Sequence, residues 1–280
     1  MSLKKFERNI QSQFGEDGVI EEIFKRIGNQ NKICIEFGAW DGIHLSNTWN
    51  LWSNHDWSAL LIEGVSDKFD TLVANTKSFA KVKPLNVFVT LNGENSLDSI
   101  FTRVGFPTDI DLLSIDIDSD DYYIFENLKN YRPRLVVVEY NPTIPPHLEI
   151  VQQPGDYYGC SALALHKLAK LKRYQLVHMT DTNMFFVRSE DFDKMNVNES
   201  ELYNLFPFQN LTNVLSSYDG QTFINRMPVY AKRMESDKPK PNRITTLFNG
   251  EVKEELKLSP TGLIPVKILR KEGKIDSAKL

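Results

Sequence analysis

Carboxylate and amide side chains follow two apolar runs in the middle of the sequence, where strands are expected to end. Asp116 and Asp118 come after the first run, and Glu139 and Asn141 after the second. Residues two apart on a strand share a face, and parallel neighbours end at one edge of a sheet, so these oxygen atoms should converge. Oxygen ligands suit Mg²⁺ or Ca²⁺ better than zinc. Asp116, Glu139 and Asn141 are therefore predicted as metal ligands.

The same residues also allow a purely structural interpretation. Asp120 or Asp121 could cap a helix that begins at Tyr122, and Glu139 would then be a buried, hydrogen-bonded carboxylate. His147 follows a proline-rich loop over the same edge. Its near-neutral reference pKa suits a general base, as does the position of Asp116, although a surface histidine without a role is the alternative for His147.

A second group of candidates lies earlier, in the segment Glu36-Phe-Gly38-Ala-Trp-Asp41-Gly42. It follows an apolar run and contains glycines that allow the backbone to approach a ligand closely. It lacks the spacing of the dinucleotide fingerprint. The next apolar run ends at Glu63, about twenty residues beyond this turn, where parallel-sheet proteins commonly hold a ribose diol.

Short apolar runs alternate with helical patterns, which predicts a parallel sheet covered by helices on both faces. Only a polar tetrapeptide, residues 180–183, separates the last two runs, so they should form a hairpin with an antiparallel last strand. Helices are expected near residues 19–27, 66–79, 96–104, 122–130 and 161–172. The expected strands are residues 33–37, 59–63, 82–90, 112–117, 135–140, 174–179 and 184–187.

The predicted fold class is α/β: a Rossmann-like three-layer sandwich with a seven-stranded, mostly parallel sheet and an antiparallel last strand. The periodicity weakens after residue 190. We therefore expect a catalytic domain with an N-terminal helix over 1–190, and a small C-terminal extension over 191–280 with a linker near 236–243.

Three motifs together resemble the FkbM-like branch of the class I S-adenosylmethionine-dependent methyltransferases. They are Ser12-Gln-Phe-Gly-Glu-Asp-Gly18, the segment Glu36–Gly42, and Ile62-Glu63, with support from Asp116 and from the hairpin Asn183-Met-Phe-Phe-Val-Arg188. The likeness covers roughly residues 10–190. The fourth strand is richer in carboxylates than is usual in this branch, and its acid cluster is similar to the ion site of metal-dependent O-methyltransferases.

The resemblance implies a cofactor site and a reaction. Glu36, Gly38 and Asp41 would line the cofactor, Glu63 would hold its ribose hydroxyls, and Asp116 would lie beside it. Gln13 would close over the same pocket, while Ser12 or Asp17 could instead cap the first helix. The expected activity is O-methylation of a sugar or polyketide-like hydroxyl on a small-molecule or glycan acceptor. The alternative is a catalytically silent cofactor-binding or protein-interaction module.

Composition narrows the class of protein further. The formal net charge is -4 and the pI is near 5.8, so nucleic acid is not an expected partner. The two cysteines, Cys34 and Cys160, do not support a disulfide framework. The sequence shows neither a signal peptide nor an apolar run long enough to span a membrane, which predicts a cytoplasmic protein.

Overall fold

The computed structural model describes residues 2–198, 200–216, 218, 222–224, 264–266, 268–269 and 275–276. The chain divides into two compact units, Met1–Pro207 and Phe208–Leu280. The expected boundary near residue 190 lies inside the first unit. The predicted linker at 236–243 lies outside the described residues.

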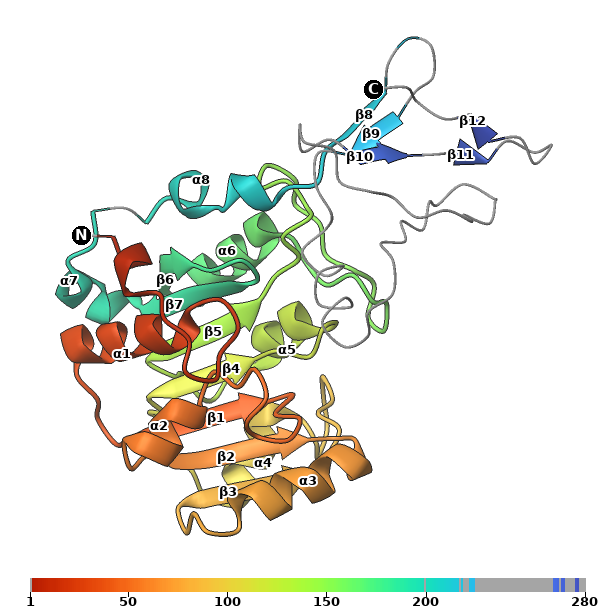
Figure 1. The fold of residues 1–280 in the computed structure, drawn as a ribbon. Coiled ribbons are helices and arrows are strands. Elements are labelled where there is room, and N and C mark those ends of the chain that lie inside the picture. The colour runs from red at the N-terminus through yellow and green to blue at the C-terminus, as the bar shows by residue number, and fades with distance from the viewer. Residues whose placement is uncertain are drawn as a thin grey trace. The chain divides into compact units, whose positions relative to one another are not determined.

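The first unit contains a seven-stranded sheet with the order β3-β2-β1-β4-β5-β7-β6 (Figure 1). The first five strands are parallel, and β7 is antiparallel to both of its neighbours, β5 and β6. This is a Rossmann-like sheet with an antiparallel β7, as the sequence predicted. The strands are β1 (Ile33–Phe37), β2 (Ser58–Glu63), β3 (Val82–Asn86), β4 (Leu112–Ile115), β5 (Leu135–Glu139), β6 (Tyr174–Met179) and β7 (Asn183–Arg188).

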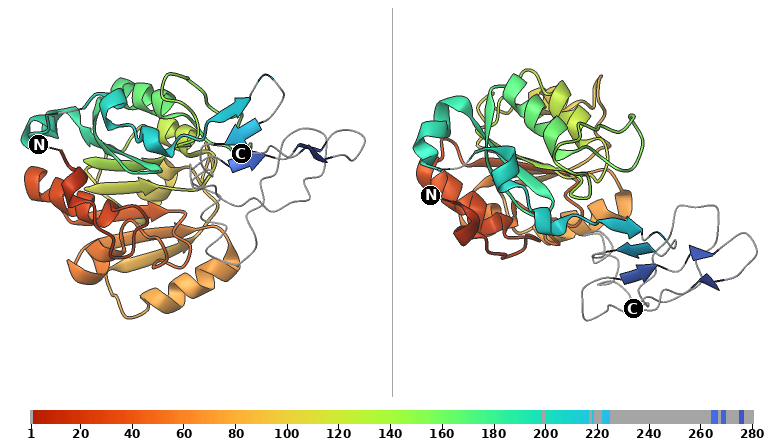
Figure 2. Two further views of the ribbon diagram at one scale, coloured as in Figure 1. Left: turned by 45° about the horizontal axis from the view of Figure 1, so that its top comes forward. Right: turned by 90° about the horizontal axis from the view of Figure 1, so that it is seen from above.

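Helices cover both faces of this sheet (Figures 1 and 2). The helix before β1 ends at Gly28, whose N–H bonds to the carbonyl of Phe24, as the C-cap prediction requires. Ser96 and Ser161 each accept an N–H bond as N-caps. The helices are α1 (Glu16–Ile27), α2 (Trp49–Asn54), α3 (Ser66–Thr76), α4 (Leu97–Val104), α5 (Asp121–Asn127), α6 (Ala162–Leu171), α7 (Phe192–Met195) and α8 (Leu202–Leu205), with short turns η1 (Lys4–Phe6) and η2 (Ser189–Asp191).

Five predicted elements differ from the structure by two or more residues at one end. The first helix begins at Glu16 and not near residue 19, and the helix expected over 66–79 ends at Thr76. The strand expected over 82–90 ends at Asn86, and the one expected to reach Ile117 ends at Ile115. The helix expected over 122–130 ends at Asn127. The short helix α2 was not predicted, because six residues without a capping side chain carry little periodic signal.

One apolar cluster joins α1, α2 and α3 to a single face of the sheet. It includes Cys34 of β1, Leu61 of β2, Leu112 of β4, Val137 of β5 and Phe185 of β7, all almost fully buried. On the opposite face, Phe125 of α5 stacks on Phe186 of β7. Both faces are therefore apolar, as expected for a parallel sheet between two helical layers.

The second unit is described only in short segments. The turn η3 (Phe208–Asn210) is followed by β8 (Val214–Ser216) and β9 (Thr222–Ile224), which pair antiparallel. The strand predicted near residues 263–269 corresponds to β10 (Ile264–Val266), paired with β9, and β11 (Ile268–Leu269), paired with β12 (Ile275–Asp276). Within the part of the chain that the structure describes, we find no helix with the length and hydrophobicity needed to cross a membrane.

Candidate functional site

Polar side chains form a row along the carboxyl edge of the sheet. On β1, β2, β4, β5 and β7, the residue two positions closer to this edge than the last member of the apolar cluster is polar and shares the same face. The apolar surface between the sheet and α1 to α3 therefore changes to a polar surface where the parallel strands end. The row consists of Glu36 (β1), Glu63 (β2), Ser114 (β4), Glu139 (β5) and Asn183 (β7).

The turn after β1 requires glycine at Gly38. Its φ is +80°, and a Cβ there would lie 1.9 Å from the carbonyl oxygen of Asp116. The end of β1 thus meets the backbone at the end of β4 directly. Gly38 is also exposed at the edge. The absence of a side chain therefore allows β1 to approach β4 closely and keeps the surface above the turn accessible.

Glu36 anchors the loop that follows this turn. One carboxylate oxygen accepts bonds from the hydroxyls of Ser46 at 2.5 Å and Thr48 at 2.7 Å, and the other accepts the N–H of Asn47 at 2.7 Å. Burial raises the pKa of Glu36, and these hydrogen bonds oppose the rise. Asn47 in turn donates to Ser114 at 3.1 Å, which links the loop to β4.

Glu63 holds the same turn from the second strand. Its oxygens accept the backbone N–H groups of Trp40 at 2.9 Å and Val65 at 2.7 Å. The Trp40 backbone is left-handed, with φ +50°, a conformation that costs energy for a bulky residue. The bond to Glu63 helps to stabilise it.

Backbone donors in this turn are already used within the chain. Asp41 accepts the N–H groups of Ile43 at 2.9 Å and His44 at 2.7 Å. A phosphate-binding turn needs such N–H groups to point at the ligand. This turn instead presents carboxylates. Internal acceptors take the N–H groups of Gly38, Ala39, Trp40, Gly42, Ile43 and His44.

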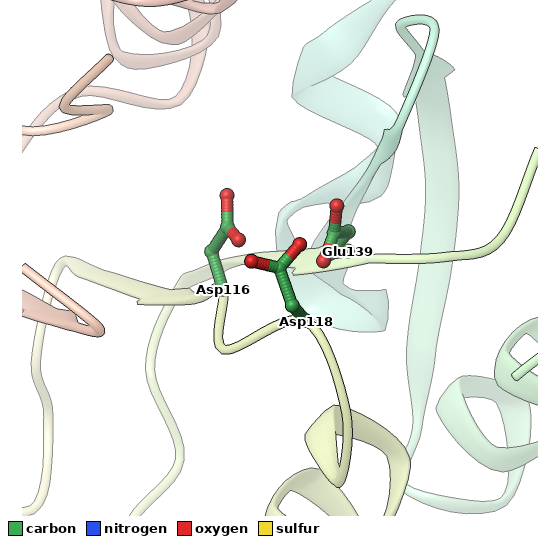
Figure 3. A group of neighbouring side chains, drawn as sticks. All are labelled: Asp116, Asp118 and Glu139. Carbon is green, nitrogen blue, oxygen red and sulfur yellow. The ribbon is translucent and has the colours of Figure 1, made fainter. Parts of the chain in front are cut away.

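Asp116, Asp118 and Glu139 lie together at the ends of β4 and β5 (Figure 3). A carboxylate oxygen from each lies within 4.8 Å of the others. The chain leaves the strand at Ile115, and Asp118 has a left-handed backbone with φ +60°. A turn, and not the expected strand alternation, therefore brings Asp118 to the cluster. The convergence that the sequence predicted is present for these three carboxylates.

Asp120 and Asp121 organise the backbone beside this cluster. Asp121 accepts the N–H groups of Ile117 at 2.9 Å and Ser119 at 3.0 Å. Burial raises its pKa to about 6, against the effect of these bonds, and the negative charge of Asp118 adds to the rise. Asp121 is thus buried at the first turn of α5. The N-cap residue, Asp120, makes no side-chain cap bond, and Asp121 accepts N–H groups that precede the helix, so the capping interpretation is not confirmed.

Asn141, the third predicted metal ligand, bonds to the loop that follows β5. Its side-chain oxygen accepts the N–H of Thr143 at 2.9 Å and its hydroxyl at 2.6 Å, and its amide donates to the carbonyl of Tyr158 at 2.9 Å. Its role as an ion ligand stays a prediction, and an ion would have to compete with Thr143 for the side-chain oxygen. Asp118 is the side chain that the structure places beside Asp116 and Glu139.

The loop that carries Gln13 is held by two buried acids at the start of α1. Asp17 accepts the N–H groups of residues 10, 11 and 12, and Glu16 accepts those of Gln13 and Phe14. Glu16 also accepts the hydroxyl of Thr180 at 2.7 Å. Ser12 accepts the N–H of Asp17, as the capping interpretation expects. Gln13 is half-buried, and its predicted cofactor contact remains untested.

His147 is exposed in the loop between β5 and α6, so its role as a base also stays a prediction. Sequence reasoning did not predict two aromatic contacts near the turn after β1. Phe88 covers Gly64, where a Cβ would lie 2.4 Å from its ring, and the Lys68 ammonium lies 3.6 Å from the centroid of Trp40. Neither follows from a motif, since both contacts join separate loops.

Neither a protein-family model nor a curated protein sequence matches the chain. Among solved structures it is similar to the N-terminal domain of EvdMO1 with SAH bound, at 11% identity over 61% of this chain and 79% of that one, with a TM-score of 0.42. A SAM-dependent methyltransferase from Aquifex aeolicus is 10% identical over 66% of this chain and 94% of that one, with a TM-score of 0.37. The [4+2]-cyclase SpnF is 8% identical over 74% and 80%, with a TM-score of 0.43. The fold assignment above depends on the strand order and not on these similarities.

Proposed function

We propose that this chain is an S-adenosylmethionine-dependent methyltransferase that methylates a hydroxyl group of a small-molecule or glycan acceptor, sugar or polyketide-like. The observation that carries the proposal is the turn after β1, where Glu63 places a carboxylate at the end of β2 while internal acceptors take most of the backbone N–H groups of the turn. This arrangement disfavours a pyrophosphate and suits a cofactor with a cationic sulfonium and a ribose diol.

The hydrogen-bond acceptors of Glu63, at the end of β2, suit the two hydroxyl groups of a ribose. Each Glu63 oxygen accepts a backbone N–H bond, and a carboxylate has about four acceptor sites, so capacity remains for two hydroxyl groups. The two N–H bonds also keep the carboxylate oriented before the cofactor arrives. Glu63 therefore binds the ribose, and Gly38 leaves room beside it.

When bound, S-adenosylmethionine would supply an electrophilic methyl group for transfer to the acceptor oxygen, with S-adenosylhomocysteine as the leaving group. Asp116 lies at the edge between β1 and β4, where its carboxylate can accept the hydroxyl proton. The loops around it hold the acceptor oxygen in line, which is the main contribution of positioning to the rate. His147 is the second candidate base.

The carboxylate oxygens of this cluster are the type of ligand that a hard divalent cation such as Mg²⁺ prefers. Asp116, Asp118 and Glu139 would hold it, and it would polarise the acceptor oxygen as a Lewis acid. All three donors are oxygen atoms within 4.8 Å of one another.

The decisive experiment is calorimetric titration of the protein with S-adenosylhomocysteine. We expect binding, and we expect Glu63→Ala to weaken it about 10- to 100-fold, because a charge-assisted bond to the ribose is lost. Glu94→Ala, at an exposed carboxylate, is the matched control. Absence of binding to the wild type would refute the proposal, and equal affinity in Glu63→Ala would remove this residue from the site. Transfer of a labelled methyl group then separates an enzyme from a silent module.

A further inference from the structure

Two loops from different strands are tied together beside the carboxylate cluster. We call residues 116–121 the carboxylate loop and residues 152–159 the tyrosine loop. Gln152 is 1% exposed and donates to Asp120 at 2.8 Å and to the carbonyl of Asp156 at 2.8 Å. Its side-chain oxygen accepts the N–H groups of Tyr158 at 2.9 Å and Gly159 at 2.6 Å. One buried amide thus connects the two loops.

Further bonds hold the tyrosine loop from both sides. Asp120 also accepts the N–H of Gly155 at 3.2 Å, and the hydroxyl of Tyr123 donates to the carbonyl of Gln152 at 2.6 Å. Asn141, two residues after Glu139, donates to the carbonyl of Tyr158. The backbone of the tyrosine loop is therefore fixed to the ends of both β4 and β5.

The rings on this anchored backbone are exposed. Tyr157 is 79% exposed and Tyr158 is 45% exposed. Tyrosine offers a large contact surface at a small cost in conformational entropy, which makes it a frequent ligand-binding residue. A loop whose backbone is bonded to the carboxylate loop, and which presents two exposed tyrosine rings, has the composition of a binding surface.

The charge of this region decides which ligand it accepts. Carboxylates repel phosphate and carboxylate groups, and they accept bonds from hydroxyl groups. Aromatic faces bind the apolar face of a ring. A neutral ring with several hydroxyl groups satisfies both requirements.

We propose that the tyrosine loop binds the acceptor, that the acceptor is a neutral polyhydroxylated ring such as a pyranoside, and that Gln152 is the positioning residue that holds the loop against the carboxylates. This inference rests on the proposed function and narrows its acceptor. Gln152 acts through the backbone of Tyr158 and through Asp120, and it does not itself contact the acceptor.

The test is saturation-transfer NMR on the full chain with S-adenosylhomocysteine present. The probes are methyl β-D-glucopyranoside, methyl β-D-galactopyranoside, catechol and adenosine monophosphate. We expect signals from at least one glycoside and none from the nucleotide. Tyr157→Ala should weaken glycoside binding about 3- to 10-fold, because a ring contact with the glycoside is lost at an exposed position.

Gln152→Ala should weaken the glycoside to a similar extent, while its neighbour Gln153→Ala, at an exposed glutamine, should not. Affinity for S-adenosylhomocysteine should stay equal in all variants. Hydrogen exchange at the amides of Tyr158 and Gly159 should rise in Gln152→Ala alone. Faster exchange with unchanged glycoside affinity would show a structural role only and overturn the positioning role.

Two other results would overturn the substrate class. One is the absence of glycoside signals in a protein that binds S-adenosylhomocysteine, and the other is preference for catechol or for the nucleotide. Failure to bind S-adenosylhomocysteine would instead refute the proposed function, so the two failures are distinguishable.

Discussion

The two edges of the sheet arrange their carboxylates in opposite ways. At the amino edge, Asp111 and Asp191 both pair with Arg134, at 3.1 and 3.2 Å, and Lys194 bonds to Asp191 at 2.6 Å. At the carboxyl edge, Asp116, Asp118 and Glu139 lie beside one another. Paired charges stabilise a fold, whereas gathered like charges cost stability. This contrast is the one that the proposed function predicts for an edge that binds a ligand.

The pKa values of two aspartates show the same contrast. Burial alone would raise the pKa of Asp191, but the bonds from Arg134 and Lys194 lower it below its ordinary value. Burial raises the pKa of Asp121 to about 6, and Asp118 adds to the rise. The partner charges, and not the residue type, decide the direction.

The largest effect is expected at the amino edge, where Arg134→Met should lower the free energy of unfolding by about 3–5 kcal/mol. The variant leaves the buried carboxylate of Asp111 without its cation and leaves Asp191 with Lys194 alone. Arg134 also donates to the carbonyls of Ile27 and Gly28, which would lose a partner. Urea unfolding measures the change. Arg132→Met is the control, because its pair with Glu190 is exposed and should be worth at most about 1 kcal/mol. Similar losses in both variants would remove the distinction between buried and exposed pairs.

A smaller effect is expected from pH at the carboxyl edge. Asp121 has a folded-state pKa of about 6, above its ordinary value of 3.8, so its protonated form favours the folded state. Its contribution is complete below about pH 4 and is lost as the pH rises through 6, by up to about 3 kcal/mol. Asp191, with a lowered pKa, has the opposite sign and loses its contribution in acid. Urea unfolding between pH 4 and 7 should show a weaker pH dependence in Asp121→Asn than in the wild type, and equal curves would contradict the assignment.

The smallest effect is expected at Asp118. Asp118→Asn should raise the free energy of unfolding by about 0.5–1 kcal/mol in chelator, because it removes one like charge and asparagine tolerates the left-handed backbone. Added Mn²⁺ should stabilise the wild type and not the variant if the cluster holds an ion. Asp70→Asn, at an exposed site, is the control. A loss of stability in Asp118→Asn, measured in chelator, would mean that the carboxylates are not in mutual repulsion.

The sequence was sufficient to predict the sheet. Seven apolar runs, a polar tetrapeptide before Asn183 and capping residues such as Ser161 and Gly28 act locally, so their structural effect can be read within a few residues. The carboxyl-edge positions of Glu36, Glu63, Asp116 and Glu139 follow from the same strand ends. Periodicity alone therefore predicted which of these polar side chains lie at the carboxyl edge of the sheet.

Only the tertiary structure decided which partners these side chains have. Asn141 bonds to Tyr158 and Asp120 to Gln152, while a left-handed residue at Asp118 completes the acid cluster. The Asp111, Arg134 and Asp191 pairs at the amino edge also join segments far apart in the chain. Such contacts depend on how loops from different strands meet, and no local pattern encodes that meeting. The sequence therefore determined at which strand ends the polar groups lie, and packing between loops determined which residues each of them contacts.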